Sequence, residues 1–281
     1  MASVLYRPSK KLGQNFLTDK HIASLIVSHA ELTNSDTVLE PGAGFGTLTR
    51  LLGDQAGHVL AIEKDPRLAS HLRKEFAENS KISIIEGDVL RINIPTFNKV
   101  VGTPSYNLSS KLILFLTRKR FELASLVFQK EFGQRLFAKV GTADYGRLSI
   151  TAQRSLIIQP IMTISPTAFR PRPKVDSILL RISPQRTQTV ENEEFFELLV
   201  RGLFNQRRRV VKGSLIHFLS GRIGAENARA TVEAIRLPEK RVYQLTISEI
   251  EQLSRQLSET LAKRGLMLSE SHVSSGLAQR Q

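Results

Sequence analysis

Short apolar runs alternate with amphipathic stretches through the first half of the chain. Buried strands are predicted at the apolar runs, residues 37–39, 58–62, 82–85 and 100–101. Helices are predicted where apolar positions recur at helical spacing, residues 21–30, 47–52 and 66–78. Because crossover helices join parallel strands, this order predicts a parallel sheet with helices on both faces. Three later runs are predicted to complete the sheet, residues 123–128, 148–152 and 177–182.

The second half of the chain has no strand pattern beyond residue 190. Helices are predicted at residues 192–204, 209–219, 225–235 and 248–263. The pattern therefore predicts an α/β fold, a Rossmann-like sheet followed by a small all-helical domain. Its predicted parts are a first domain at 1–182, a polar linker at 183–190, a helical domain at 191–265 and a disordered tail at 266–281.

A glycine-rich turn, residues 40–46, joins the first strand of the sheet to its helix. Gly42 and Gly44 allow a sharp bend and a close approach to a bound nucleotide. Glu63 ends the next strand, where this kind of sheet places the carboxylate that holds a ribose. Asp88 follows the third strand. Acids after three strands suit the cationic S-adenosylmethionine better than a pyrophosphate, and an ordinary NAD site is the alternative.

Charge and composition limit the classes of partner and the kinds of site that this chain can have. The chain has 281 residues and a formal net charge of +14, which favours RNA or DNA as a partner. It has no cysteine, so disulfides and thiolate metal sites are excluded, and no metal site is predicted. The N-terminus is not a signal peptide, and no apolar run approaches the roughly 18 residues of a membrane span. We expect a cytoplasmic protein that binds no membrane.

Ordered motifs along the chain resemble the ribosomal RNA adenine N6,N6-dimethyltransferase family, in its archaeal branch. They lie at residues 11–17, 40–46, 63, 87–88, 106–110, 129–131, 145–149 and 169–177. The resemblance implies transfer of methyl groups from S-adenosylmethionine to N6 of two adjacent adenines near the 3′ end of small-subunit rRNA. It implies a role in ribosome biogenesis, with a monomer acting on this rRNA within a pre-ribosomal particle.

The resemblance also implies residue roles. Glu63 would hold the cofactor's ribose, and Asp88 would accept from the amino group of its adenine. The full predicted cofactor set is Asn15, Leu17, Gly42, Gly44, Glu63, Asp88 and Thr103. The predicted RNA contacts are Arg147, Arg170, Arg172, Lys174, Arg207, Arg208, Arg209 and Lys212.

The chain departs from the family at the catalytic tetrapeptide, which is usually Asn-Leu/Ile-Pro-Tyr. Here it reads Thr-Pro-Ser-Tyr at residues 103–106. An exocyclic adenine amine is a poor nucleophile, because its lone pair is delocalised into the ring. The family's Asn oxygen and Pro carbonyl accept its N–H bonds and direct the lone pair at the methyl group. Ser105 keeps a carbonyl, whereas the Thr103 hydroxyl is a shorter and weaker acceptor.

Two aromatic residues complete the predicted catalytic set of Thr103, Ser105, Tyr106 and Phe169. Tyr106 would stack on the unstacked target base and Phe169 would cover its other face, although both fit ordinary core packing as well. Attenuated activity is predicted. One alternative is a non-catalytic or weakly catalytic RNA-binding assembly factor on the same fold. Another is a relative that acts on large-subunit rRNA, which is less favoured because the basic block at residues 204–212 resembles that of the small-subunit branch.

Overall fold

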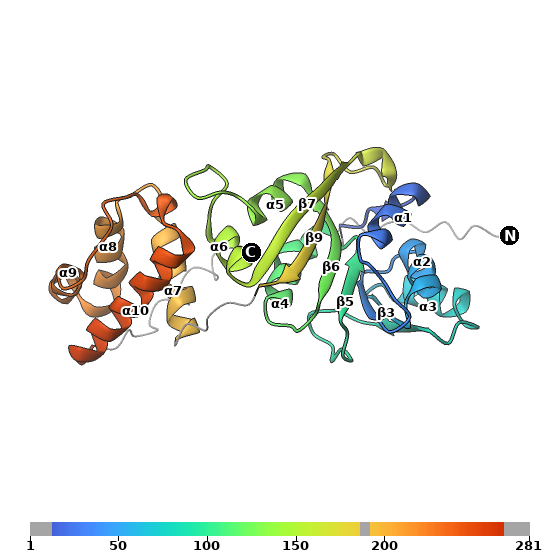
Figure 1. Cartoon of the computed structure of the whole chain (residues 1–281), viewed down its shortest axis with the longest axis horizontal. Helices are drawn as coiled ribbons and strands as arrows, with labels where there is room; N and C mark the ends of the chain where they lie inside the picture. Colours follow the sequence, from blue (N-terminus) through green and yellow to red (C-terminus); the bar gives the residue numbers. More distant parts are fainter. Residues whose placement is uncertain (1–12, 186–191, 267–281) are drawn as a thin grey trace. The chain divides into compact units, whose positions relative to one another are not determined.

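The computed structural model describes residues 13–185 and 192–266, which form two compact units (Figure 1). The first unit holds the described residues up to Phe137 and residues 151–185. The second holds Ala138–Ile150 and the described residues from Asn192 onward. Segment 138–150, which the sequence analysis placed in the first domain, thus packs with the second unit. Most of the predicted linker and nearly all of the predicted tail lie outside the described residues.

A seven-stranded sheet forms the centre of the first unit, in the order β4-β3-β2-β5-β6-β9-β7 (Figure 1). The strands are β2 (Thr37–Pro41), β3 (His58–Glu63), β4 (Ile82–Glu86), β5 (Lys99–Gly102), β6 (Leu123–Gln129), β7 (Leu156–Ile164) and β9 (Ser177–Pro184). Pairs from β4 to β6 are parallel, and β9 is antiparallel to both β6 and β7. The predicted Rossmann-like sheet is therefore present, with an antiparallel edge.

Helices precede and connect the strands, and several of them pack on the sheet. They are α1 (Lys20–Ser28), α2 (Thr47–Gln55), α3 (Pro66–Glu75), α4 (Ser109–Leu116), α5 (Lys130–Leu136) and α6 (Arg147–Ser155). Side-chain caps set two of the starts: Asp19 accepts from the His21 N–H at 2.9 Å, and Asp65 accepts from the Arg67 N–H at 3.0 Å. The core that results is apolar and includes Ile26, Leu52 and Val59.

The predicted strand at 148–152 is wrong, because these residues lie in α6. Leu148, Ile150 and Ala152 alternate as a strand would, but so short a run does not separate strand from helix. The strand comes next, as β7, which the sequence analysis missed. It is an edge strand with mixed exposure, and it carries Pro160 at a register shift, so it lacks a strand's usual pattern.

The second unit is helical, as predicted. Its helices are α7 (Glu193–Phe204), α8 (Val211–Ile223), α9 (Ala225–Glu233) and α10 (Ile247–Lys263). Thr246 and Glu249 form a capping box that starts α10. The Tyr145 ring is fully buried in this unit's core, and its hydroxyl donates to the Leu245 carbonyl at 3.0 Å. Within the described residues, no helix is long and apolar enough to cross a membrane.

Candidate functional site

The carboxyl ends of neighbouring strands meet along one edge of the sheet. Pro41 pairs with Ile62, and Glu63 pairs with Glu86, so β2, β3 and β4 end together. A pocket of about 260 Å³ opens there. All seven residues of the predicted cofactor set line it, and so do Phe45, Lys64, Asn107 and Lys111, which the sequence analysis did not single out. Ligands of doubly wound sheets bind at this edge.

The glycine turn between β2 and α2 forms one wall of the pocket. Gly42, Gly44 and Gly46 have φ of 82°, 61° and 79°. Residues with a Cβ rarely adopt this left-handed backbone conformation. A Cβ at Gly44 would lie 2.9 Å from the Phe16 ring, and one at Gly46 would lie 2.8 Å from Phe76. The turn therefore requires glycine both for its backbone and for its close packing.

Glu63 is buried at the end of β3 and is fixed by backbone N–H groups. Its Oε2 accepts from Gly44 at 2.9 Å and its Oε1 from Asp65 at 2.8 Å. Burial raises the pKa of Glu63, and these hydrogen bonds oppose that rise. Each carboxylate oxygen can accept a further bond, so the group can also hold hydroxyls of a ligand.

Glu40 lies deeper, at the end of β2. Thr49 donates to its Oε2 at 2.6 Å. Burial is the largest influence and raises the pKa of Glu40 to about 8, so this carboxyl is mostly protonated at neutral pH. Glu40 therefore contributes little negative charge to the pocket at neutral pH.

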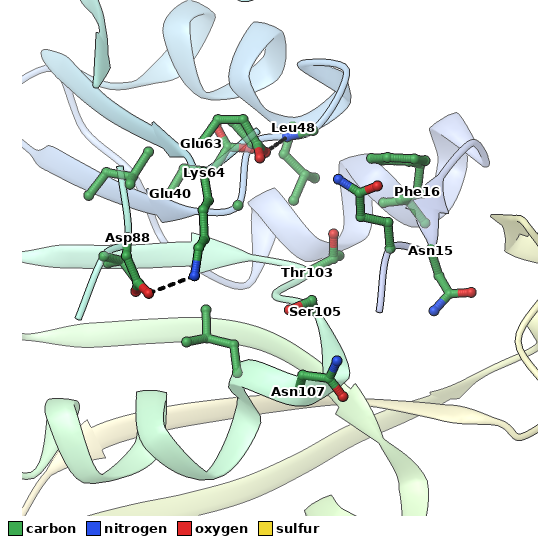
Figure 2. Close-up of a pocket in the computed structure, with 18 of the residues that line it drawn as sticks. Asn15, Phe16, Glu40, Leu48, Glu63, Lys64, Asp88, Thr103, Ser105 and Asn107 are labelled. Carbon is green, nitrogen blue, oxygen red and sulfur yellow. Dashed lines mark hydrogen bonds and ion pairs between the residues drawn. The ribbon is translucent and has the colours of Figure 1, made fainter. Parts of the chain in front are cut away.

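Asp88 follows β4 and is paired with Lys64. Lys64 extends from the end of β3 to within 2.9 Å of Asp88 Oδ2 (Figure 2). Partial burial raises the pKa of Asp88, but the hydrogen bonds from Lys64 and from the Leu90 N–H outweigh it, and the pKa lies below its usual value. Asp88 is thus a charged acceptor. The position of Lys64 directly after Glu63 was the only sequence signal for this pair.

A two-stranded ladder brings the N-terminal motif to the pocket. Strand β1 (Phe16–Leu17) pairs antiparallel with β8 (Phe169–Arg170). Thr47 Oγ1 also donates to the Leu17 carbonyl at 3.1 Å. These contacts hold Asn15 and Leu17 beside the glycine turn. They also join this motif to the Phe169 block, which lies about 150 residues later in the chain.

A second, smaller cavity of about 10 Å³ adjoins the pocket. It is lined by Gly13, Asn15, Thr103, Pro104, Ser105, Tyr106, Val127 and Phe169. The structure therefore brings the four predicted catalytic residues together. Asn15, Thr103 and Ser105 line both cavities, and Figure 2 shows them close together on the opposite side of the pocket from Asp88. The two cavities meet at the tetrapeptide.

The tetrapeptide has a defined backbone. The Ser105 carbonyl accepts from the Leu108 N–H at 2.8 Å and keeps a second lone pair. Tyr106 opens a short 3₁₀ turn, Tyr106–Leu108, and its hydroxyl lies 2.9 Å from Ser177 Oγ. Phe169 is buried and also lines this cavity.

The predicted RNA-contact residues fall into separate groups. Arg170, Arg172 and Lys174 are exposed in the first unit, and Arg147, Arg208, Arg209 and Lys212 are exposed in the second. Arg207 differs from these. Its guanidinium donates to the carbonyls of Ala143 and Thr142 at 2.7 and 2.9 Å and lies over the Tyr243 ring.

The hydrogen-bond acceptors of the larger pocket fit S-adenosylmethionine. Glu63 and Asp88 are acceptors suited to ribose hydroxyls and an adenine amino group, and the glycine turn leaves room for close approach. Over residues 13–185 and 192–266, no three His, Asp or Glu side chains gather where a metal ion could be held.

Comparison with known proteins agrees with this chemistry. The model of the family "Ribosomal RNA adenine dimethylase" matches residues 7–255. A probable ribosomal RNA small subunit methyltransferase A from Thermococcus onnurineus is 40% identical over 257 residues, which cover 89% of this chain and 93% of that protein. The structure of a dimethyladenosine transferase from Plasmodium falciparum is similar, with a TM-score of 0.77 and 26% identity over 90% of this chain and all of that one.

A 23S rRNA methyltransferase, ErmE, is also similar, with a TM-score of 0.64 and 27% identity over 87% of this chain and all of that one. The fold, the pocket and the matched length agree, and the chain belongs to the ribosomal RNA adenine dimethylase family.

Proposed function

We propose that this protein transfers methyl groups from S-adenosylmethionine to N6 of two adjacent adenines near the 3′ end of small-subunit rRNA. The observation that carries the proposal is the meeting of the two cavities at Thr103 and Ser105. One cavity has the acceptors for the cofactor, and the other has aromatic walls for a base. The relative from Thermococcus onnurineus is named for small-subunit methylation.

In the larger pocket, Glu63 holds the ribose and Asp88 accepts from the adenine amino group. Asn15, Leu17, Gly42, Gly44 and Thr103 supply the remaining contacts. The bound cofactor supplies an electrophilic methyl group. Tyr106 and Phe169 line the smaller cavity, which at about 10 Å³ must widen to take the target base once that base has left its stack.

The target amine is activated by hydrogen-bond acceptors. The Ser105 carbonyl, through its second lone pair, and the Thr103 hydroxyl accept the two N–H bonds and orient the nitrogen lone pair. The target nitrogen would form its bond to the methyl carbon as the carbon–sulfur bond of the cofactor breaks, with S-adenosylhomocysteine as the leaving group. The methylated amine then loses a proton to solvent, so no strong base is required. RNA phosphates contact the exposed basic residues, Arg147, Arg170, Arg172, Lys174, Arg208, Arg209 and Lys212. The protein acts as a cytoplasmic monomer on a pre-ribosomal particle.

A weakly catalytic or non-catalytic assembly factor is the second candidate. The observation that favours it is the tetrapeptide itself, because Thr103 and Ser105 replace the family's Asn and Pro. Such a protein would bind the same RNA, with slow methyl transfer or none.

The test uses small-subunit particles from cells that lack this protein. Purified protein and labelled S-adenosylmethionine are added, and modified adenines are located by mass spectrometry. Dimethyladenosine at two adjacent positions near the 3′ end supports the proposal. Binding without methylation supports the assembly factor, and methylation of large-subunit rRNA instead would overturn the substrate.

A further inference from the structure

We infer that Ser177 is a positioning residue for methyl transfer, holding the Tyr106 ring in the orientation that stacks on the target base. The inference rests on the proposed function. It assigns a role to a residue that touches neither the cofactor pocket nor the smaller cavity. Its basis is the hydrogen bond of 2.9 Å between the Tyr106 hydroxyl and Ser177 Oγ.

Ser177 is a rigid point of attachment. It is fully buried at the start of β9, where it pairs with Gln129 of β6 on one side and Ile164 of β7 on the other. A buried hydroxyl is costly without a partner, so its bond to Tyr106 is favoured over an open state. The strand therefore fixes the far end of the Tyr106 side chain.

Tyr106 needs such an attachment. It sits in a short 3₁₀ turn after β5, is only partly buried, and forms one wall of the smaller cavity. The side chain has several staggered wells at χ1, so the backbone alone does not set where the ring points. The hydroxyl lies on the long axis of the ring, and its bond to Ser177 therefore fixes the direction of that axis.

A second aromatic residue of the cavity comes from the segment that carries Ser177. Phe169 lines the cavity, and Ser177 ends the block that Phe169 begins. Residues 169–177 thus supply Phe169 to the cavity and orient Tyr106 through the hydroxyl of Ser177. Both rings then keep a fixed relation to Thr103 and Ser105, where the reacting nitrogen must lie.

The test compares Ser177→Ala, Tyr106→Phe and the double variant in single-turnover methylation of small-subunit particles. Each single change should slow transfer by about tenfold, because misplacement of the base by a fraction of an ångström weakens the attack geometry. The double variant should be no slower than either single one, because both remove the same bond. Cofactor affinity should stay at the wild-type value, since neither side chain lines that pocket.

Ser125→Ala is the matched control. Ser125 is also fully buried in this sheet, and its hydroxyl donates to the Ile26 carbonyl at 2.7 Å, away from Tyr106. It should lower the melting temperature as Ser177→Ala does, yet leave the rate unchanged. Equal rate losses in both serine variants would reduce Ser177 to a structural role and overturn the inference.

Other outcomes separate the two proposals. Methylation by the wild type at rates matched by Ser177→Ala and Tyr106→Phe overturns the inference alone. Faster transfer by Ser177→Ala also overturns it, because the bond would then be a latch that closes the cavity. If the wild type binds the particles but transfers no methyl group, the proposed function falls, and this inference falls with it.

Discussion

Glu63 accepts hydrogen bonds from the backbone and is the proposed acceptor of the ribose hydroxyls, which makes it the sharpest residue-scale test of the cofactor pocket. Glu63→Ala removes the acceptor of the Gly44 and Asp65 N–H groups and the predicted acceptor of the ribose hydroxyls. We expect a loss of about 1.5–3 kcal/mol in S-adenosylmethionine binding, measured by calorimetric titration. Glu86→Ala at the end of the next strand is the control, because Glu86 is exposed. Unchanged affinity in Glu63→Ala would place the cofactor elsewhere.

Glu40 predicts a pH dependence of stability. Its pKa in the fold is about 8, above the 4.5 of an ordinary glutamate, because burial disfavours the charged form, so folding favours the protonated form. Its contribution to the free energy of unfolding is fully present below pH 4.5 and is lost as pH rises through 8. Glu40→Gln should therefore gain stability relative to the wild type over this range, by on the order of a few kcal/mol at its upper end.

Denaturant titrations of the cofactor-free protein at several pH values measure this difference. Glu86→Gln, which makes the same change at an exposed carboxyl, is the control. A Glu40→Gln profile that is parallel to that of the wild type would mean that Glu40 is ionised in the fold.

The tetrapeptide predicts a gain of activity. Thr103 is an atom shorter than Asn, so its oxygen falls about 1 Å short of the amine, a misplacement that can cost on the order of 100-fold. Ser105 has φ of −56°, close to the angle that proline fixes. Thr103→Asn with Ser105→Pro should therefore fit the turn and raise single-turnover methylation by about 10- to 100-fold.

Thr103→Ala is the companion variant, and it should lower the rate further. The role given to this hydroxyl is wrong if Thr103→Ala matches the wild type. If neither the wild type nor the double variant methylates small-subunit particles, the assembly-factor function gains support.

At the residue scale, the sequence predicted which acids and glycines line the pocket, because the ends of strands can be located from the local apolar pattern. Glu63 and Asp88 follow clear apolar runs, and the parallel register brings them to one pocket. The Lys64–Asp88 pair and the Tyr106–Ser177 bond could not be predicted, because each depends on side-chain directions across the sheet.

At the scale of elements, local pattern predicted the central strands and the C-terminal helices. It failed at α6 and β7, where an edge strand carries proline and an amphipathic helix mimics alternation. It also gave no sign that segment 138–150 packs with the second unit. That packing depends on Tyr145 and on Arg207, contacts between parts of the chain about 60 to 100 residues apart.

Arg207 provides the element-scale prediction. It holds segment 138–150 through two carbonyls and stacks on Tyr243, so Arg207→Ala should lower the free energy of unfolding by about 1–3 kcal/mol. Arg208→Ala removes the same charge from an exposed neighbour and should change stability by less than about 0.5 kcal/mol. Thermal or denaturant unfolding measures both. Equal stability of the two variants would leave Arg207 free to serve as an RNA contact.

At the scale of the whole molecule, the net charge of +14 is the main feature that the fold does not explain. Core packing needs no such excess, whereas a phosphate backbone attracts it over long range. Exposed basic residues occur in both units, so affinity for RNA should be spread over several groups. RNA affinity should therefore depend strongly on salt concentration, and this dependence should weaken stepwise as the basic residues are replaced.

The last prediction measures one such step. Each lost phosphate contact reduces the slope of log affinity against log salt by about 0.7–0.9, so replacing Arg208, Arg209 and Lys212 by Ala should reduce it by about 2–3. Cofactor binding should be unchanged, because none of the three lines the pocket. Arg229, Arg236 and Lys263, exposed in the same unit, form the matched control: their replacement by Ala removes equal charge and should change the slope by less than about one. Equal reductions in both triple variants would assign the effect to net charge, and RNA docking would then have no specific site at residues 208–212.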